Sequence, residues 1–502
     1  MKVCFISLFL SLAIAFTTCP LYAQTGTVLY NFCSVPYCLD GGNPTSNLTP
    51  DGAGNFYGTT SESGATNQGT VFELSPDGNG GWNESVIHTF AGGSDDGANP
   101  LSGVIFDSAG NLYGTTQNGG SEGGSGVVFE LSPVAGGWTE TILASFGYRE
   151  GLCGAPVYGL VMDREGNLYG ATSGVYTYCK GIAFELSPST GGTWTINVIG
   201  CCFYFASASP AVVMDSAGDI FGAVENEVFE LSPKDGGGWN LDLIHIFSGT
   251  KDGNYATGAP VLDSAGNLFG ATAEGGSKNL GTVYKLTPRK NGTWAETILY
   301  SFKGGKQGSA PLAGLVLDDT GNIYGTTYTG GKYGFGTVFE LAAPTGKGSY
   351  KETVLWSFNG QDGANPHASL ALENGKLFGT TQFGGPNEEL GDGVVFEVNP
   401  SPSLTATSLS SSPNPSTHGQ VVSFTAVITS SAGAPPDGEM VSFMEGKVLL
   451  GTGTLSGGAA SLATSTLKVG TRSVTAVYEG EINFAGSTSN LVKQVVEKSV
   501  EQ

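Results

Sequence analysis

Short runs of apolar residues fill the chain from residue 27 to residue 400, and Gly-rich or polar stretches separate them. In one unit the segment Gly336–Leu341 alternates apolar and polar positions, which is the two-residue period of a half-buried β-strand. Three further apolar runs of strand length belong to the same unit, namely Leu312–Leu317, Asn322–Thr327 and Tyr350–Phe358. The pattern predicts four antiparallel strands per unit, joined by tight turns.

A ten-residue phrase marks each unit, and its clearest copy is Asp107-Ser-Ala-Gly-Asn-Leu-Tyr-Gly-Thr-Thr116. The phrase occurs seven times, with glycines at Gly54, Gly110, Gly166, Gly218, Gly266, Gly321 and Gly375. Successive copies are therefore 56, 56, 52, 48, 55 and 54 residues apart. A period in this range is typical of a solenoid or a propeller, and four strands per unit favour propeller blades.

The last unit lacks a fourth strand, because it ends at Phe396-Glu-Val-Asn-Pro400. The segment Thr27–Phe32 near the N-terminus matches the end of a fourth strand such as Thr297–Phe302. Lending this strand to the last blade would close the ring and cover an exposed edge. We therefore predict an all-β fold in which residues 24–400 form a seven-bladed β-propeller, with 27–32 pairing beside 393–398.

Aromatic residues recur on the second and third strands of the units. We interpret most of them as packing between neighbouring blades, because wedge-shaped sheets need bulky side chains at their contacts. The alternative is that some of them stack on sugars.

The composition changes after residue 400, where Ser, Thr and Val alternate in short runs. We predict a linker at 401–404 and a β-sandwich at 405–502. The segment Tyr478–Ser489 resembles the ending of bacterial immunoglobulin-like repeats, which space or present other domains. No cysteine lies in residues 405–502, so hydrophobic packing would have to hold this sandwich together.

The N-terminal residues 1–23 combine Lys2, an apolar stretch and Leu21-Tyr22-Ala23, which predicts a secretory signal peptide. Six cysteines remain after its removal, and an even number in an exported chain favours disulfides. We expect bridges Cys33–Cys38 and Cys153–Cys179. Cys201 and Cys202 are adjacent, and either one could pair elsewhere.

The formal net charge of −23 would repel nucleic acid and anionic lipid, so neither is expected as a partner. Beyond the N-terminus no apolar run approaches the ~18 residues of a membrane helix, and we expect no membrane insertion. Cations, neutral glycans and proteins remain as candidate partners, and the oligomeric state stays open.

Acidic residues follow the fourth strands of five units, usually before Gly. We expect these loops to share the face around the central channel and to form a broken ring of ligand candidates consisting of Asp40, Asp96, Glu150, Asp252 and Asp362. Carboxylates with loop carbonyls would suit Ca²⁺, which takes 6–8 oxygen ligands. The competing interpretation is that Asp-Gly is only favourable turn chemistry, and no cofactor is required by the sequence.

Signs of catalysis are sparse. Of four histidines, His88 and His245 share a strand position that Ala144 or Tyr300 occupies in other units, and only His367 is expected near the channel face. The glycines precede strands and not helices, so they form no phosphate-binding loop. No nucleophile elbow is apparent.

The phrases Asp-x-x-Gly-Asn-Leu-Tyr-Gly-Thr-Thr and Gly-Thr-Val-Phe-Glu-Leu-Ser-Pro together resemble the GloVer-type tandem repeats of bacterial secreted proteins. The hairpin portion is also similar to NHL and SMP30-type propellers. The first resemblance implies export and a propeller, and it carries no established catalytic residues. The chain departs from that family in ending at Gln502 without a sorting signal or membrane tail.

Three functions follow from these observations. The first is a non-enzymatic binding or adhesion protein, secreted, periplasmic or on the cell surface, that presents its acidic, Gly-rich face to a glycan, protein or cation. The second is a metal-dependent propeller lyase or lactonase. The third is a structural component of the cell envelope.

Overall fold

The computed structural model describes residues 26–147, 152, 154–174, 181–203, 212–249, 251–344, 346, 348–386, 391–431, 433–481 and 484–499. The side chains of 201–203 and 481 are not described. The predicted signal peptide, residues 1–23, lies outside the described part. The chain divides into two compact units, Thr25–Ser401 and a C-terminal unit that contains Pro402–Gln502. None of the described helices is long and apolar enough to cross a membrane.

The first unit consists of seven four-stranded antiparallel sheets within the described residues, numbered here in chain order. Sheet 1 has β2 (Thr49–Pro50), β3 (Phe56–Thr60), β4 (Thr70–Pro76) and β5 (Trp82–Thr89). Sheet 2 has β7 (Ile105–Phe106), β8 (Leu112–Thr115), β10 (Val127–Val134) and β11 (Gly137–Ser145). Sheet 3 has β12 (Val161–Met162), β13 (Leu168–Ala171), β14 (Gly181–Pro188) and β15 (Trp194–Phe203).

Sheet 4 has β16 (Val212–Met214), β17 (Ile220–Val224), β18 (Glu227–Pro233) and β19 (Trp239–Ile246). Sheet 5 has β20 (Asn254–Leu262), β21 (Leu268–Glu274), β22 (Thr282–Pro288) and β23 (Trp294–Ser301). Sheet 6 has β24 (Val316–Leu317), β25 (Ile323–Thr327), β26 (Thr337–Ala342) and β27 (Lys351–Ser357). Sheet 7 has β28 (Ala371–Glu373), β29 (Lys376–Thr381), β30 (Val394–Val398) and the N-terminal β1 (Gly26–Asn31).

Additional short elements lie in the loops, namely β6 (Gly97–Ala98), β9 (Asn118–Gly119) and the 3-10 turns η1 (Pro36–Cys38) and η2 (Gly305–Gln307). The first strand of sheet 6 is shorter than the sequence predicts: β24 keeps only two of the six residues expected at 312–317. The preceding residues bond to neighbouring sheets instead: the Gly314 N–H donates to Ser369 Oγ, and the Pro311 carbonyl accepts from Thr257 Oγ1.

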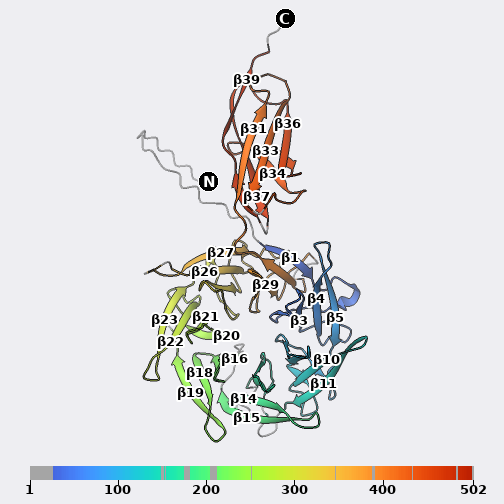
Figure 1. The fold of residues 1–502 in the computed structure, drawn as a ribbon, viewed down its shortest axis with the longest axis vertical. Coiled ribbons are helices and arrows are strands. Elements are labelled where there is room, and N and C mark those ends of the chain that lie inside the picture. The colour runs from blue at the N-terminus through green and yellow to red at the C-terminus, as the bar shows by residue number, and fades with distance from the viewer. Residues whose placement is uncertain are drawn as a thin grey trace, which may run out of the picture. The chain divides into compact units, whose positions relative to one another are not determined.

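The sheets follow one another around a ring that gives a propeller-like fold (Figure 1). Seven clusters of buried apolar residues each join two successive sheets, and one of them joins sheet 7 to sheet 1. As the sequence predicts, β1 pairs antiparallel with β30, from Gly26 opposite Val398 to Asn31 opposite Val394. The N-terminal strand therefore completes the last sheet and covers its edge.

The repeated phrase builds the inner hairpin of each sheet. In the copy at Asp107 the carboxylate accepts the N–H groups of Ala109 and Asn111 and the Asn111 side-chain amide, and so closes the turn between first and second strands. The Tyr113 hydroxyl donates to the same carboxylate and to Glu130 on the third strand. These residues act as scaffold.

The glycine of the second strand has a separate role, because it lies opposite the aromatic residue of the third strand in all seven sheets. A Cβ added at these glycines would come within 2.3–2.7 Å of that ring or its hydroxyl. The positions are Gly58, Gly114, Gly170, Gly222, Gly270, Gly325 and Gly379. Only a residue without a side chain leaves room for the ring to lie across its own sheet.

The C-terminal unit has two sheets over one apolar core. The first contains β31 (Thr405–Ser412), β33 (Val422–Ser430) and β36 (Ala459–Thr464). The second contains β32 (Ser416–Thr417), β34 (Met440–Glu445), β35 (Val448–Thr454), β37 (Gly470–Glu481), β38 (Phe484–Thr488) and β39 (Val492–Glu497). Phe424 of one sheet and Phe443 of the other lie in this core, with ring centroids 6.5 Å apart.

Substituting Gly114→Ala should destabilise the first unit by about 1–3 kcal/mol, because the new methyl group would overlap Phe129 in a filled interface. Chemical denaturation would measure the change. Gly159→Ala is the matched control, because no atom lies within 4 Å of its added Cβ. Equal effects of the two substitutions would contradict the assigned role of the Gly–aromatic pair.

Candidate functional site

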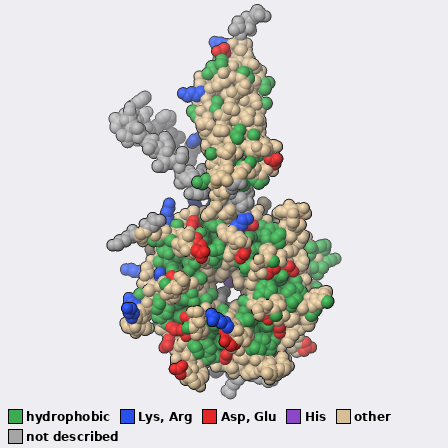
Figure 2. All heavy atoms as spheres, in the orientation of Figure 1, with side chains coloured by type: hydrophobic (Ala, Val, Ile, Leu, Met, Phe, Trp, Pro, Cys, Tyr) green, Lys and Arg blue, Asp and Glu red, His purple; other side chains and the backbone are tan. Residues whose placement is uncertain are grey.

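The loops after the second strand and after the fourth strand meet at one end of the sheets, which we call the loop face. Backbone bridges tie the two kinds of loop together, for example Ala364 with Phe383, Ser309 with Thr329, and β6 with β9. Four of the acidic residues predicted as ligand candidates, Asp40, Asp96, Asp252 and Asp362, come from the described parts of these loops. On the side of the molecule drawn in Figure 2, acidic side chains are scattered around the ring and not gathered in one patch.

Asp40 is buried, with only 2% of its surface exposed. Its Oδ2 accepts hydrogen bonds from the Tyr30 hydroxyl and from the backbone N–H and hydroxyl of Ser34. The carboxylate therefore fixes the start of its own loop. Within the described part of the chain, its Oδ1 has no hydrogen-bond partner.

The other described loop carboxylates use the same device. Asp96 accepts from the Ala91 and Gly97 N–H groups, Asp252 from those of Ser248 and Gly253, and Asp362 from that of Asn359 and from Trp356 Nε1. Among the described residues, no metal-sized group of three ligands contains two of these predicted acids. Glu150 lies outside the described residues.

His367 lies in the loop before β28, where its ring meets that of Tyr328 from the neighbouring sheet at 6.2 Å. Burial lowers the pKa of His367, so the imidazole is neutral at physiological pH. No described group of potential metal ligands includes it.

The predicted Cys33–Cys38 disulfide is present and closes the loop that contains η1. The other predicted bridge, Cys153–Cys179, lies outside the described residues, as do the side chains of Cys201 and Cys202. Asp392 approaches the Cys33–Cys38 sulfurs. Because both sulfurs are in the disulfide, we do not regard this group as a metal site.

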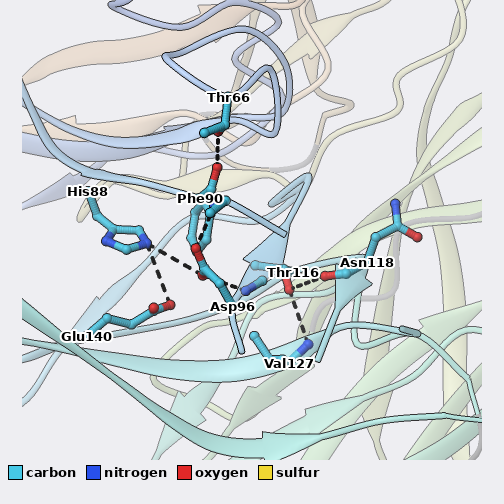
Figure 3. A network of polar contacts seen from close by, with 10 residues as sticks. Thr66, His88, Phe90, Asp96, Thr116, Asn118, Val127 and Glu140 are labelled. Atoms are coloured by element: carbon cyan, nitrogen blue, oxygen red, sulfur yellow. Dashed lines mark hydrogen bonds and ion pairs between the residues drawn. The ribbon is translucent and has the colours of Figure 1, made fainter. Parts of the chain in front are cut away.

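A polar cluster that sequence reasoning missed lies between sheets 1 and 2. His88 of β5 points its Nε2 atom at Asp96 Oδ1, 3.8 Å away, and at Glu140 Oε1 of β11, 3.6 Å away (Figure 3). These side chains are only 14–19% exposed. His88 Nε2 and Glu140 Oε1 have no hydrogen-bond partner among the residues that the structure describes. We call such a cluster between two sheets a junction.

The junction between sheets 4 and 5 repeats this arrangement with His245, Asp252 and Glu296. His245 Nε2 lies 3.5 Å from Glu296 Oε1, and neither atom has a hydrogen-bond partner. Two other junctions replace histidine by tyrosine. These junctions contain Tyr30, Asp40 and Glu84, and Tyr300, Gln307 and Glu352.

A β-bulge in the fourth strand explains how each strand serves two junctions. In β5 the register shifts between Val86 and His88, which pair with Phe72 and Val71. Residues before the bulge face the preceding sheet, as Glu84 does, and His88 after it faces the following one. A shift occurs at the equivalent place in all seven sheets.

The sequence holds a signal for these junctions. Wherever the position after the bulge is His or Tyr, the partner position on the next fourth strand is Glu; the pairs are Tyr30–Glu84, His88–Glu140, His245–Glu296 and Tyr300–Glu352. In the other three units the position after the bulge is neither His nor Tyr, and the partner is not Glu. These pairs are Ala144–Ile196, Gly200–Leu241 and Trp356–Gly26. Comparing successive units at these two positions together would have found the clusters.

Burial governs the charges of the junction carboxyls. It raises the pKa of Glu140 to about 7, with help from the Asp96 charge and against the opposing effect of His88. Burial also opposes ionisation of Asp96, but the nearby His88 imidazole and the hydrogen bonds from the Ala91 and Gly97 N–H groups outweigh it and lower the pKa of Asp96. Burial together with the Asp40 charge raises the pKa of Glu84 to about 8.

The loop face also presents exposed aromatic rings. Tyr37 in η1 is 91% exposed, and Tyr255, Tyr333 and Phe335 are 38–44% exposed. Hydrogen bonds fix the η1 turn, because the Cys38 N–H donates to the Val35 carbonyl and the Cys38 carbonyl accepts the N–H groups of Gly41 and Gly64. Cys33, Tyr37 and Cys38 all adopt positive φ, between 50° and 62°, which non-glycine residues rarely do.

The Gloeobacter/Verrucomicrobia repeat model matches residues 14–227 and 217–466. The chain belongs to the Gloeobacter/Verrucomicrobia repeat family. This confirms the resemblance seen in the ten-residue phrase, and the all-β, propeller-like fold belongs to this repeat-family protein. No curated protein matches it in sequence.

Solved structures that resemble this repeat-family protein do so distantly. Virginiamycin B lyase from Staphylococcus aureus is 10% identical, with 74% of this chain and 99% of that chain covered and a TM-score of 0.46. A puromycin-hydrolyzing peptidase of Mycobacterium tuberculosis is 13% identical, with 82% and 63% covered and a TM-score of 0.44. The extracellular domain of a protein assigned to a hybrid two component system of B. thetaiotaomicron is 11% identical, with 95% and 59% covered and a TM-score of 0.43. Likenesses this weak carry no argument about activity.

Substituting Glu84→Gln should change how stability depends on pH. Folded Glu84 keeps its proton up to about pH 8, whereas an unfolded glutamic acid releases it near pH 4.5. Deprotonation therefore favours the unfolded chain, and stability is lost as pH rises between these values. The variant does not suffer this loss. After discounting for partial exposure, its free energy of unfolding relative to that of the wild type should be about 1–2 kcal/mol more favourable at pH 8.5 than at pH 5.

Denaturant unfolding of wild type and variant at both pH values would measure this difference. Asp95→Asn in an exposed part of the loop face removes the same charge and serves as the control. A pH profile of Glu84→Gln parallel to that of wild type would contradict the assigned burial of the protonated carboxyl.

Proposed function

We propose that this chain is an exported, non-enzymatic binding protein whose loop face takes up a carbohydrate. The observation that carries the proposal is Tyr37, which is 91% exposed on a turn closed by the Cys33–Cys38 disulfide. A tyrosine ring presented this way offers an apolar face and a hydroxyl to a partner. A turn held in a sparsely populated backbone conformation is typical of binding sites.

The proposed architecture is a closed seven-bladed β-propeller followed by an immunoglobulin-like sandwich. Seven four-stranded sheets, seven apolar clusters joining successive sheets, and the pairing of β1 with β30 support the propeller. Two sheets over a core without cysteines support the sandwich. In this proposal the sandwich acts as a spacer between the propeller and its point of attachment, or as a domain that presents the propeller to its partner.

Export is supported by the signal-like sequence at residues 1–23 and by the disulfide, since disulfides persist mainly in oxidising compartments. The proposal therefore places the mature chain outside the cytoplasm, in the periplasm or beyond.

A carbohydrate fits the chemistry of the loop face better than a charged ligand does. Asp40 and Asp362 hold their own loops with their carboxylates, and Asp96 and Asp252 direct theirs toward a histidine between two sheets, so these four acids offer little to a charged ligand that docks on the loop face. The exposed rings are mostly tyrosines, which combine an apolar face with a hydroxyl and lose little entropy on binding. A neutral sugar also avoids repulsion by the net charge of −23.

A glycan array, followed by calorimetric titration of the best ligand, tests the proposal. Tyr37→Ala should weaken binding at least about tenfold, because one stacking contact of about 1.4 kcal/mol is lost. Tyr37→Trp should retain binding. Val134→Ala, an exposed apolar residue at the opposite end of its sheet, is the control and should leave affinity unchanged.

The double variant Cys33→Ser/Cys38→Ser should also lose affinity, because the ring would no longer be held in place before binding. An array without a reproducible ligand, or affinity that is indifferent to Tyr37→Ala, would refute carbohydrate binding by this turn.

A further inference from the structure

We propose that this protein holds two divalent transition-metal ions, one at the His88–Asp96–Glu140 junction and one at the His245–Asp252–Glu296 junction. The proposal is independent of carbohydrate binding. It rests on side chains that come together only when two neighbouring sheets pack.

The distances suit a small ion. In each group one imidazole nitrogen and two carboxylate oxygens lie within 4.8 Å of one another. The histidine–carboxylate distances are shorter: Nε2 of His88 lies 3.6 Å from Glu140 Oε1 and 3.8 Å from Asp96 Oδ1, and Nε2 of His245 lies 3.5 Å from Glu296 Oε1. Ligands about 2.0–2.2 Å from a tetrahedral metal are roughly 3.4 Å apart, so small rotations of these side chains would complete the geometry.

The histidine and glutamate donor atoms at these junctions lack hydrogen bonds to the described residues. Nε2 of each histidine and Oε1 of each glutamate are buried, and neither has a hydrogen-bond partner in the described ranges. Buried polar atoms are almost always satisfied by protein, water or an ion. Within the same ranges, Oε1 of Glu84 and of Glu352 is also unpartnered at the tyrosine junctions, so the feature that only the two histidine junctions share is an unpartnered imidazole nitrogen beside two carboxylates. This combination points to a cation as their common occupant.

The rest of each junction fixes its ligands in position. Backbone N–H groups of the loop hold Asp96 and Asp252, and the bulge turns each histidine toward the following sheet. The rings of Phe90 and Phe247 pack edge-on against His88 and His245, at 4.7 and 4.6 Å. The ligands are therefore already oriented before an ion arrives.

The donor set selects a class of ion. One imidazole with two carboxylates suits Zn²⁺, Mn²⁺, Fe²⁺ or Co²⁺. Ca²⁺ prefers 6–8 oxygen ligands and no imidazole, so it is the wrong ion for this place. Three protein ligands leave further coordination positions for water.

The junction between sheets 5 and 6 provides a natural comparison. Tyr300 occupies the histidine position and Gln307 the aspartate position, and both donate hydrogen bonds to Glu352 at 3.1 and 2.6 Å. Here protein donors satisfy Oε2 of the glutamate, whereas its Oε1 has no hydrogen-bond partner among the described residues. Where histidine and aspartate replace them, the glutamate loses these donors, and a cation would take their role.

The experiment uses the full mature chain without an affinity tag, and Zn²⁺ and Co²⁺ as probes. After chelation and dialysis, titration calorimetry and the visible spectrum of Co²⁺ should report two equivalents per chain, one for each described junction. His88→Gln and His245→Gln should each remove one equivalent, and the double variant both. Tyr300→Phe is the control and should leave two.

A histidine variant could lose metal binding because it misfolds, so a variant that gains a site provides a second test. Tyr300→His/Gln307→Asp recreates the ligand set beside Glu352, and a third equivalent is expected. Saturable binding of two ions that the histidine variants remove would support the proposal. No saturable binding of either probe, stoichiometry unchanged in the double variant, or displacement of the probes by equimolar Ca²⁺ would overturn it.

Discussion

The fold depends on one steric relation, the pairing of a glycine on the second strand with an aromatic ring on the third. The ring lies across the glycine, where a Cβ would come within 2.3–2.7 Å. Its edge then meets the phenylalanine that ends the fourth strand of the preceding sheet, at ring-centroid distances of 4.9–5.2 Å in six contacts. A chain of such contacts fills the space between sheets and sets their spacing around the ring.

This scaffold leaves the outer strand free to vary. The bulge in each fourth strand sends one side chain toward the preceding sheet and another toward the following one, so every junction combines residues about one repeat apart. Four junctions hold a glutamate with His or Tyr, and three hold Ala, Gly or Trp against Ile, Leu or Gly. Substituting one side alone would bury an unpaired carboxyl or leave a gap, which explains why the two positions change together.

Much of this arrangement was readable from the chain. The spacing of the ten-residue phrase predicted the repeated sheets, and the missing last strand predicted the pairing of β1 with β30. The candidate site was less accessible. His88 and His245 looked like ordinary strand residues because Ala144 and Tyr300 share their position, and the glutamates that meet them lie 52 and 51 residues further along. These residues belong to successive units, so the pattern within one unit does not show that they meet.

The sequence by itself determined the local elements, because hairpin closure by Asp107, the alternation of apolar positions and the need for Gly114 under Phe129 all act within one unit. Only the tertiary structure decided the chemistry of the loops and junctions. It turned the Asp40 carboxylate inward to hold its own loop, exposed Tyr37 on a disulfide-closed turn, and brought Glu140 to His88. The physical reason is that burial and proximity between sheets depend on how neighbouring units pack, which the pattern within a unit does not specify.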